Sequence, residues 1–345
     1  MIKLKDIAEK AGLNVSTVSR ALLDKPDISA ETRRRVKKIA GELGYSPKHI
    51  KSNLIGVLVP EVTSQYYAEL VHVMEKNLRA KGYTMICMLT GFNIKRIDSA
   101  LESLCRQGVG GIILSEATFE NDDGIPNEVL AKPGIPIVVQ SEIRNVSPHD
   151  SIYIDQYKII TLAVDHLIGL GHTKIGYIGE DLSNIRYLAQ IDLMKQKGLE
   201  IDPRFFKCGS ERFEKGGYLR AQELLNEPEL PTAVIASYDQ MAVGAIKAFT
   251  EAGVKVPKNM SIVGVDNVIG NDYMFTRLTS ITNPVEQLGI IAVKLLLDNI
   301  SDPAGHVIQH VALQSKLVIR DSTAPPPQVK RTVNLNENHA LRNRT

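Results

Sequence analysis

Short apolar runs alternate with longer amphipathic segments along most of this chain, from Ile55 onwards. The runs read IGVLVP, TMICML, GIILS, IPIVVQ, IGYIG, AVIAS and SIVGV. Nearly continuous apolar strands are typical of parallel sheets that are buried on both faces. The segments between them, such as the one around Ala68–Lys81, have the length of crossover helices. We therefore predict an α/β body with parallel sheets and helices on both faces.

Polar residues directly follow several of these runs. They are Glu61, Ser141, Tyr238, Asp239 and Asp266. In parallel α/β sheets, ligands bind beyond the carboxyl ends of the strands. The sequence therefore predicts a binding site for a small molecule at this edge of the sheets.

The first 46 residues follow a different, purely helical pattern. Apolar residues recur at helical spacing from Leu4 to Ala11, and Gly12 ends that helix. A second helix over STVSRALL can be capped by Asn14 or Ser16, and a third begins after the capping residue Ser29. Two short helices at a sharp turn, closed by a third, form an all-α helix-turn-helix head, whose second helix fits a DNA major groove.

The exposed side of the second predicted helix carries the candidate base-reading residues. Arg20 can donate two parallel hydrogen bonds to a guanine edge, and Ser16 can both donate and accept. Thr17 and the basic third helix are expected to meet phosphates. The apolar pattern alone also fits a three-helix module that binds proteins.

The net charge of +2 is unevenly distributed along the chain. Residues 1–50 hold eleven Lys or Arg against six Asp or Glu, whereas the remainder holds 30 against 33. A basic head on a mildly acidic body is typical of a nucleic-acid reader attached to a domain with another task. A solvated surface helix would also explain the basic stretch RRRVKK.

Other classes of protein find little support in the sequence. There is no signal peptide and no run long enough to span a membrane, so a cytoplasmic location is expected. Cys87, Cys105 and Cys208 lack CxxC spacing and are interpreted as reduced, buried thiols. Motifs of hydrolases, zinc proteases and nucleotide-binding enzymes are absent, and His306 and His310 lie in what reads as one alternating strand. We expect no enzyme, no cofactor and no metal site.

The stretch LKDIAEKAGLNVSTVSRALLDKPDISAETRRRVKKIAGELGYSP resembles the DNA-binding head of the lactose/galactose-repressor (LacI/GalR) family. The resemblance implies that Val15, Ser16 and Arg20 read bases of double-stranded operator DNA. Thr17, Tyr45 and Lys48 complete the predicted DNA contacts.

Residues 55–322 resemble the effector and dimerisation domain of the same family, which is similar to periplasmic sugar-binding proteins. Matching stretches include HLIGLGHTKIGYIG and LTSITNPVEQLGIIAVKLLL. The resemblance implies two lobes with a cleft between them. Lobe 1 is expected at about 55–155 and 285–312, and lobe 2 at about 156–284 and 313–322.

The resemblance also implies effector-binding residues. Arg186 and Asp266 match the pair that holds sugar hydroxyls, and Tyr66 and Tyr67 fall where the family places aromatic rings. The remaining predicted contacts, Ser141 and Tyr238, replace an Asp and an Asn of the family pattern. A further departure, Ala189–Gln190, stands where the family has Gly-Tyr. The effector is expected to be a carbohydrate, with a phosphorylated sugar or a nucleobase as alternatives.

The segments on either side of this domain also depart from the family pattern. The predicted linker, residues 47–54, has only seven residues from Lys48 to Leu54, about two helical turns fewer than the family's. We expect weaker bending of the operator for this reason, because the family's hinge helix inserts a Leu into the minor groove. Residues 323–345 contain three consecutive prolines and a polar remainder, and are expected to be a disordered tail.

The sequence therefore predicts a homodimeric transcriptional repressor that binds operator DNA under the control of a small molecule. The alternative is a small-molecule-binding protein with a vestigial head, which the short linker would favour. The sequence leaves open the identity of the effector, whether it induces or corepresses, the operator sequence, and dimer versus tetramer.

Overall fold

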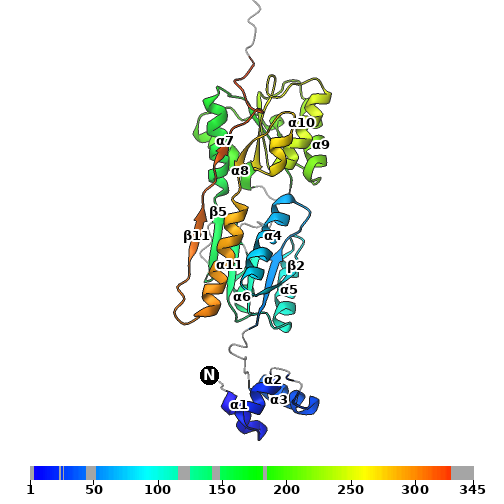
Figure 1. Ribbon diagram of the computed structural model, residues 1–345. Helices are drawn as coiled ribbons and strands as arrows, with labels where there is room; N and C mark the ends of the chain where they lie inside the picture. Colours follow the sequence, from blue (N-terminus) through cyan, green and yellow to red (C-terminus); the bar gives the residue numbers. More distant parts are fainter. Residues whose placement is uncertain are drawn as a thin grey trace, which may run out of the picture.

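The computed structural model describes residues 4–22, 25, 27–43, 52–115, 125–141, 148–181 and 185–327. The head consists of α1 (Leu4–Ala11), α2 (Val15–Leu22) and α3 (Ala30–Glu42). Gly12 ends α1 with a φ of +62°, a conformation that suits glycine. Ala8, Val18 and Val36, one from each helix, are buried together in a small core. The three helices therefore form one packed unit (Figure 1).

Lobe 1 is built on a six-stranded sheet with the order β11-β5-β4-β3-β1-β2, in which all neighbouring strands are parallel. Its strands are β1 (Leu54–Val59), β2 (Thr84–Leu89), β3 (Gly111–Ser115), β4 (Ile137–Ser141), β5 (Asp150–Ile154) and β11 (His310–Leu313). Its helices are α4 (Gln65–Ala80), α5 (Ile94–Arg106), α6 (Asn127–Ala131) and α11 (Val285–Ser301).

Lobe 2 is built on a second six-stranded sheet with the order β12-β10-β9-β8-β6-β7, in which only β12 is antiparallel to its neighbour. Its strands are β6 (Ile175–Ile178), β7 (Phe206–Lys207), β8 (Ala233–Ala236), β9 (Ser261–Asp266), β10 (Thr279–Thr282) and β12 (Leu317–Val318). Its helices are α7 (Gln156–Gly169), α8 (Ile185–Gln196), α9 (Phe213–Leu225) and α10 (Asp239–Glu251), with short 3-10 turns at Pro203–Phe205 and Ile269–Tyr273.

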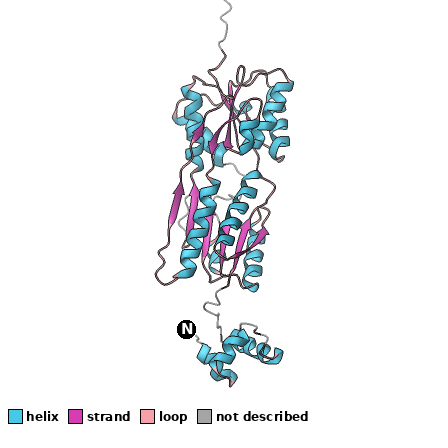
Figure 2. Cartoon of the chain, in the orientation of Figure 1, coloured by secondary structure: helices cyan, strands magenta, loops and turns pink. Residues whose placement is uncertain are grey.

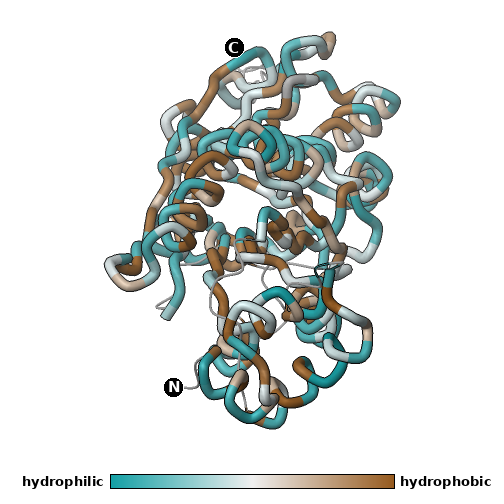
Figure 3. The backbone as a smooth tube through the Cα atoms, turned by 60° about the horizontal axis from the view of Figure 1, so that its bottom comes forward, coloured by the Kyte–Doolittle hydropathy of each residue, from teal (hydrophilic) through white to brown (hydrophobic). Residues whose placement is uncertain are grey.

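Helices cover both faces of each sheet (Figure 2). In lobe 1, Ile55 and Val57 pack with Leu70 of α4, whereas Leu58 packs with Leu101 of α5. In lobe 2, α7 and α8 lie against one face, and α9 and α10 lie against the other. The hydropathy of the chain alternates between hydrophilic and hydrophobic along most helices (Figure 3). This arrangement is the two-lobed α/β body that the sequence predicts.

The chain passes between the lobes three times. The passages lie between β5 and α7, between β10 and α11, and between β11 and β12. All three passages are short, with one residue between β5 and α7, two between β10 and α11, and three between β11 and β12. Leu54, which the sequence assigned to the linker, is the first residue of β1. The rest of the predicted linker up to Lys51 lies outside the described residues.

Close packing of α9 against α10 fixes the start of α9, which lies beside the cleft. A Cβ on Gly217 would approach the backbone oxygen of Met241 to 1.9 Å, and one on Gly244 would approach the backbone oxygen of Glu214 to 1.9 Å. Larger residues at these two positions would push the helices apart. The glycines therefore keep the first turn of α9 in a fixed place.

Two expectations from the sequence are wrong in detail. The cysteines are not all buried, since Cys87 is exposed on β2, the edge strand of its sheet. The residues from His306 onward do not form one strand. His306 lies in a loop and contacts Asp150 at 2.7 Å, whereas His310 begins β11 and contacts Ser151 at 2.7 Å.

The C-terminal boundary of lobe 2 lies beyond residue 322. The hydroxyl of Thr323 contacts Nε2 of His166 at 3.0 Å, and the carbonyl of Ala324 accepts from Ser261 Oγ at 3.0 Å. His172 Nε2 also contacts that carbonyl at 2.8 Å. The first residues of the predicted tail are therefore held against lobe 2, while residues 328–345 lie outside the described part.

The residues that the structure describes lack two features, a membrane-spanning helix and a metal-binding cluster. No helix among them combines the length and the apolar character needed to cross a membrane. Nor do they contain a cluster of three or more His, Cys, Asp or Glu side chains suited to holding a metal ion.

Candidate functional site

The exposed face of α2 carries four of the predicted DNA contacts. Asn14 caps this helix, because its Oδ1 accepts from the backbone N–H of Thr17 at 2.8 Å. Val18 and Ala21 point into the head core, which leaves Val15 and Ser16 on the outside. Val15 is 44% exposed.

Arg20 lies at the end of the same face and is held by an acid. Its Nη1 lies 2.8 Å from Asp27 Oδ2, and both side chains are about half exposed. A guanidinium group held in this way keeps most of its donors available for a base edge. The other two predicted DNA contacts, Tyr45 and Lys48, lie outside the described residues.

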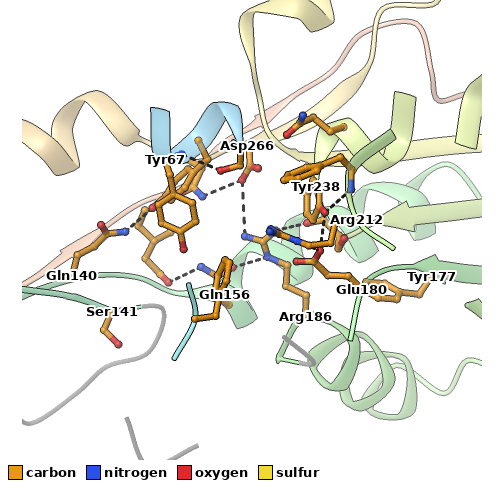
Figure 4. A pocket seen from close by; sticks show the side chains of 18 residues that line it. Tyr67, Gln140, Ser141, Gln156, Tyr177, Glu180, Arg186, Arg212, Tyr238 and Asp266 are labelled. Atoms are coloured by element: carbon orange, nitrogen blue, oxygen red, sulfur yellow. Dashed lines mark hydrogen bonds and ion pairs between the residues drawn. The ribbon is translucent and has the colours of Figure 1, made fainter. Parts of the chain in front are cut away.

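A cavity of about 100 Å³ lies between the two lobes, at the carboxyl ends of both sheets. All six residues predicted to bind the effector line it: Tyr66, Tyr67, Ser141, Arg186, Tyr238 and Asp266. They come from the first turns of α4 and α8, the ends of β4 and β9, and the residue before α10. Residues far apart in the sequence therefore converge on one site (Figure 4).

The side of the cavity formed by lobe 1 is aromatic and neutral. The rings of Tyr66 and Tyr67 meet edge to face with centroids 4.9 Å apart, and the ring of Phe92 lies 6.4 Å beyond Tyr67. Gln140 Nε2 donates to the hydroxyl of Tyr66 at 2.6 Å. This contact fixes the position of the Tyr66 hydroxyl at the edge of the cavity.

Arg186 provides a charged group on the opposite side, in lobe 2. Its Nε donates to Oε1 of Gln156 at 2.8 Å, and its Nη1 donates to the backbone carbonyl of Ser237. Nη2 lies 4.0 Å from Oδ1 of Asp266. Two hydrogen bonds thus hold the guanidinium group, with the carboxylate of Asp266 beside it (Figure 4).

Asp266 sits at the end of β9 in a strained conformation, with a φ of +98°. Its Oδ1 accepts from Asn283 Nδ2 at 3.1 Å. Burial raises the pKa of this carboxyl, while Arg186 and the Asn283 amide act in the opposite direction. The turn therefore aims a carboxylate into the cavity from a backbone shape that few residues other than glycine adopt readily.

Asp239 does not line the cavity, although it follows a predicted strand. It is fully buried behind the turn that carries Asp266, where it accepts from Ser280 Oγ at 2.7 Å, Val268 N at 2.9 Å and Asn271 Nδ2 at 2.7 Å. Burial, with a smaller effect from Asp266, raises the pKa of Asp239 to about 7. Asp239 therefore holds the Asp266 turn in position.

Two buried polar atoms of the cavity wall have no hydrogen-bond partner within the described part of the chain. They are the hydroxyl of Tyr177 and Oδ1 of Asn283. Burial raises the pKa of Tyr177, so its phenol keeps its proton. One donor and one acceptor are thus buried without a partner beside the cavity, which is costly unless a ligand or water satisfies them.

Residues that sequence reasoning missed form the remaining charged part of the site. Arg212 lies just before α9, where its Nε donates to Glu180 Oε2 at 2.7 Å. The same oxygen accepts from the hydroxyl of Tyr238 at 2.8 Å, and the Tyr238 oxygen accepts from the N–H of Phe213 at 3.0 Å. Glu180 follows the apolar run IGYIG, so the rule that selected Glu61 and Asp266 could have found it.

The departure at Ala189–Gln190 does not reach the cavity. Gln190 is fully buried on α8, where its Nε2 donates to the carbonyl of Gly176 at 3.0 Å. The replacement of the family's Gly-Tyr therefore changes the packing beneath the sheet of lobe 2.

Comparison with protein families identifies both parts of the chain. Residues 3–48 match "Bacterial regulatory proteins, lacI family", and residues 164–323 match "Periplasmic binding protein-like domain". The chain is 32% identical over 335 residues to the HTH-type transcriptional repressor PurR of Pasteurella multocida, covering 93% of this chain and 98% of that protein. It is 30% identical to the HTH-type transcriptional repressor CytR of Escherichia coli K12, covering 94% and 97% respectively.

Solved structures give the same result for the whole fold. The lac repressor dimer bound to operator and the anti-inducer ONPF has a TM-score of 0.71 at 25% identity, covering 94% of this chain and 99% of that one. A LacI family regulator from Enterococcus faecium with bound ribose has a TM-score of 0.68 at 30% identity, covering 79% and 99%. The predicted fold class is thereby confirmed. The chain belongs to the lacI family of bacterial regulatory proteins and is a DNA-binding transcriptional regulator.

Proposed function

We propose that this protein is a homodimeric repressor that binds operator DNA through α2 and is controlled by a small, neutral, polyhydroxyl ligand in the cavity between the lobes. The observation that carries the proposal is the convergence of the six predicted effector residues on one cavity at the strand ends of both lobes. The ligand acts on DNA binding only if it binds one arrangement of the lobes better than the other.

The size of the cavity favours a small ligand. The centre of a water molecule can occupy about 100 Å³ of it, a space bounded by side chains of both lobes. A pentose or a similar ring suits this space better than an oligosaccharide. The ribose-bound regulator from Enterococcus faecium, 30% identical to this chain, supports the same ligand class.

The charges in the cavity favour a neutral ligand over a phosphorylated one. Its two guanidinium groups, Arg186 and Arg212, each face a carboxylate of the cavity wall, Asp266 and Glu180. A phosphate would have to compete with these carboxylates and would be repelled by them, which costs several kcal/mol. Hydroxyl groups can instead bond to both the donors and the acceptors.

The lining also suits a sugar ring in shape and polarity. Both lobes contribute aromatic rings to the lining, for example Tyr67 from lobe 1 and Phe213 from lobe 2. Such rings can cover the apolar face of a sugar. The unpartnered phenol of Tyr177 and the unpartnered amide oxygen of Asn283 each gain a partner when a ligand hydroxyl reaches them.

A thermal-shift panel tests the ligand proposal. D-ribose, other neutral sugars and nucleosides are expected to raise the melting temperature, whereas D-ribose 5-phosphate and other phosphorylated counterparts give little or no rise. Arg186→Ala removes the rise, while the control Arg277→Ala, which breaks an exposed ion pair within lobe 2, leaves it intact. A larger rise with the phosphorylated compounds would refute the neutral-ligand proposal.

DNA recognition is assigned to the exposed face of α2, with Val15 and Ser16 near its start and Arg20 near its end. One such head reads few base pairs, so two heads in a symmetric dimer are needed for useful specificity. Selection of bound sequences from random DNA should yield a palindrome. Arg20→Ala should then weaken binding by about 1–3 kcal/mol and relax one base position, whereas the lobe 2 control Arg277→Ala should not.

In this proposal the protein acts in the cytoplasm and catalyses no reaction. Its relatives PurR and CytR are named as transcriptional repressors. Incubation of the protein with each compound that raises its melting temperature, followed by analysis of the compound, should return it unchanged.

A further inference from the structure

Arg212 connects the two lobes across the cavity. It precedes α9 in lobe 2, and its Nη1 lies 3.0 Å from Oε2 of Glu61, which follows β1 in lobe 1. Its Nε simultaneously donates to Glu180 Oε2, within lobe 2, at 2.7 Å. One guanidinium group therefore joins a carboxylate of each lobe.

Aromatic rings from both lobes enclose the same group. The guanidinium carbon lies 5.0 Å from the ring centre of Phe92, in lobe 1, and 4.5 Å from that of Phe213, in lobe 2. The side chains of Arg212 and Glu61 are only 21% and 14% exposed. Shielding from water strengthens the ion pair relative to one on the surface.

The charges around Arg212 stabilise its protonated form. Burial alone lowers the pKa of Arg212, but the carboxylates of Glu61 and Glu180 outweigh that effect and raise it. The cation is thus permanent, and so is its attraction to both lobes.

We propose that Arg212 is an interlobe clasp, which holds the two lobes in the closed arrangement by bridging Glu61 and Glu180. Separation of the lobes breaks the contacts with Glu61 and Phe92, while those with Glu180 and Phe213 remain. Arg212 therefore keeps a carboxylate partner in both arrangements. Its contact with Glu61 is the part that opening removes, and this gives the closed and open arrangements different energies.

The clasp residues also border the proposed ligand site, and this part of the inference rests on the proposed function. Arg212, Phe92 and Phe213 all line the cavity. The closed lobes fix the position of the Arg212 guanidinium group. A ligand hydroxyl can bond to that group in this position only while the lobes are closed. Glu180 is held in turn by the hydroxyl of Tyr238, so the lobe 2 half of the clasp is fixed before closure.

The clasp is tested on the full-length protein without any added ligand. Glu61→Gln removes one carboxylate from lobe 1 and leaves the Arg212–Glu180 pair intact, so the chain should still fold. Small-angle X-ray scattering is expected to show a larger radius of gyration and maximum dimension than in the wild type. The matched control is Glu227→Gln, which breaks a similarly buried pair with Lys207 inside lobe 2.

A combination of variants separates the clasp from a general effect of lost charge. Arg212→Gln should open the lobes as Glu61→Gln does, and the double variant should open them no further, because both changes remove the same contact. Arg212→Lys should also open them, since an ammonium group lacks the two-sided geometry of a guanidinium. The clasp is overturned if Glu61→Gln scatters like the wild type, or if Glu227→Gln opens the protein equally.

The scattering result is independent of the identity of the ligand. Opening in Glu61→Gln supports the clasp even if none of the neutral sugars raises the melting temperature. A neutral sugar that raises the melting temperature, together with unchanged scattering, would uphold the proposed function and remove the clasp.

Discussion

The two lobes present different chemistry to the cavity they share. From lobe 1 come aromatic rings and neutral polar groups, including Tyr66, Tyr67 and Gln140. The ionisable Arg and carboxylate side chains of the lining, Glu180, Arg186, Arg212 and Asp266, come from lobe 2. The same α/β architecture therefore carries a neutral wall on one side and a charged wall on the other.

The difference has a physical reason. Closure of the lobes covers the aromatic rings of lobe 1, which is favourable because it removes apolar surface from water. The charged groups of lobe 2 have partners within the same lobe, as Arg186 has in Asp266 and Arg212 has in Glu180, so opening leaves them paired. Lobe 2 is thus suited to fix the orientation of the ligand, and lobe 1 is suited to cover it.

The largest expected effect concerns Asp239, the buried acid that supports the charged wall. Its raised pKa favours the folded state when the carboxyl is protonated, so this contribution is fully present below about pH 4 and is lost as pH rises towards 7. A shift of about three pH units corresponds to about 4 kcal/mol. Urea unfolding of the wild type should show this loss of stability between pH 4 and 7, and Asp239→Asn should flatten it. An unchanged slope in the variant would mean that another group titrates.

Asp266→Asn tests the charged wall directly. The substitution keeps the shape of the side chain but removes the carboxylate beside Arg186, so ligand hydroxyls lose a charged acceptor. The expected loss of affinity is about 2–3 kcal/mol, or roughly 100-fold, for the compound that gives the largest thermal shift. Isothermal calorimetry measures it. Binding of near wild-type strength would show that lobe 2 does not determine ligand orientation.

Tyr66→Phe tests the neutral wall and should have the smallest effect. The variant removes only the hydroxyl that accepts from Gln140. A neutral hydrogen bond contributes about 1 kcal/mol, so affinity should fall about fivefold. A loss as large as that in Asp266→Asn would contradict the assignment of lobe 1 as a cover.

Much of the fold follows from local patterns in the sequence. Runs such as IGVLVP and AVIAS predict strands because buried parallel strands need little more than continuous apolar residues. The capping of α3 by Ser29 is equally local. By contrast, β7 and β12 have only two residues each and are defined by their neighbours in the sheet, so no pattern within them reveals them.

The candidate site divides in the same way. The end of a strand is visible in the sequence, and this rule, together with the family resemblance, leads to residues such as Asp266 and Ser141. The Arg212 clasp is not visible, because Arg212 of lobe 2 meets Glu61 of lobe 1 only when the two lobes are placed against each other. The role of Asp239 is also not visible in the sequence. Asp239 supports the Asp266 turn and its neighbour Tyr238 lines the cavity, but both simply follow the same predicted strand.

The parallel arrangement of β1 has a consequence for how the head receives information. The cavity lies at the carboxyl end of this strand, whereas the head is attached through its amino end at Leu54. Six residues of strand separate the two ends by about 20 Å, and buried strands do not stretch. The three passages between the lobes resist sliding, because sliding would pull on at least one of them. We therefore expect ligand state to reach the head as a tilt of lobe 1 as a whole, which would set the spacing of the two heads in a dimer.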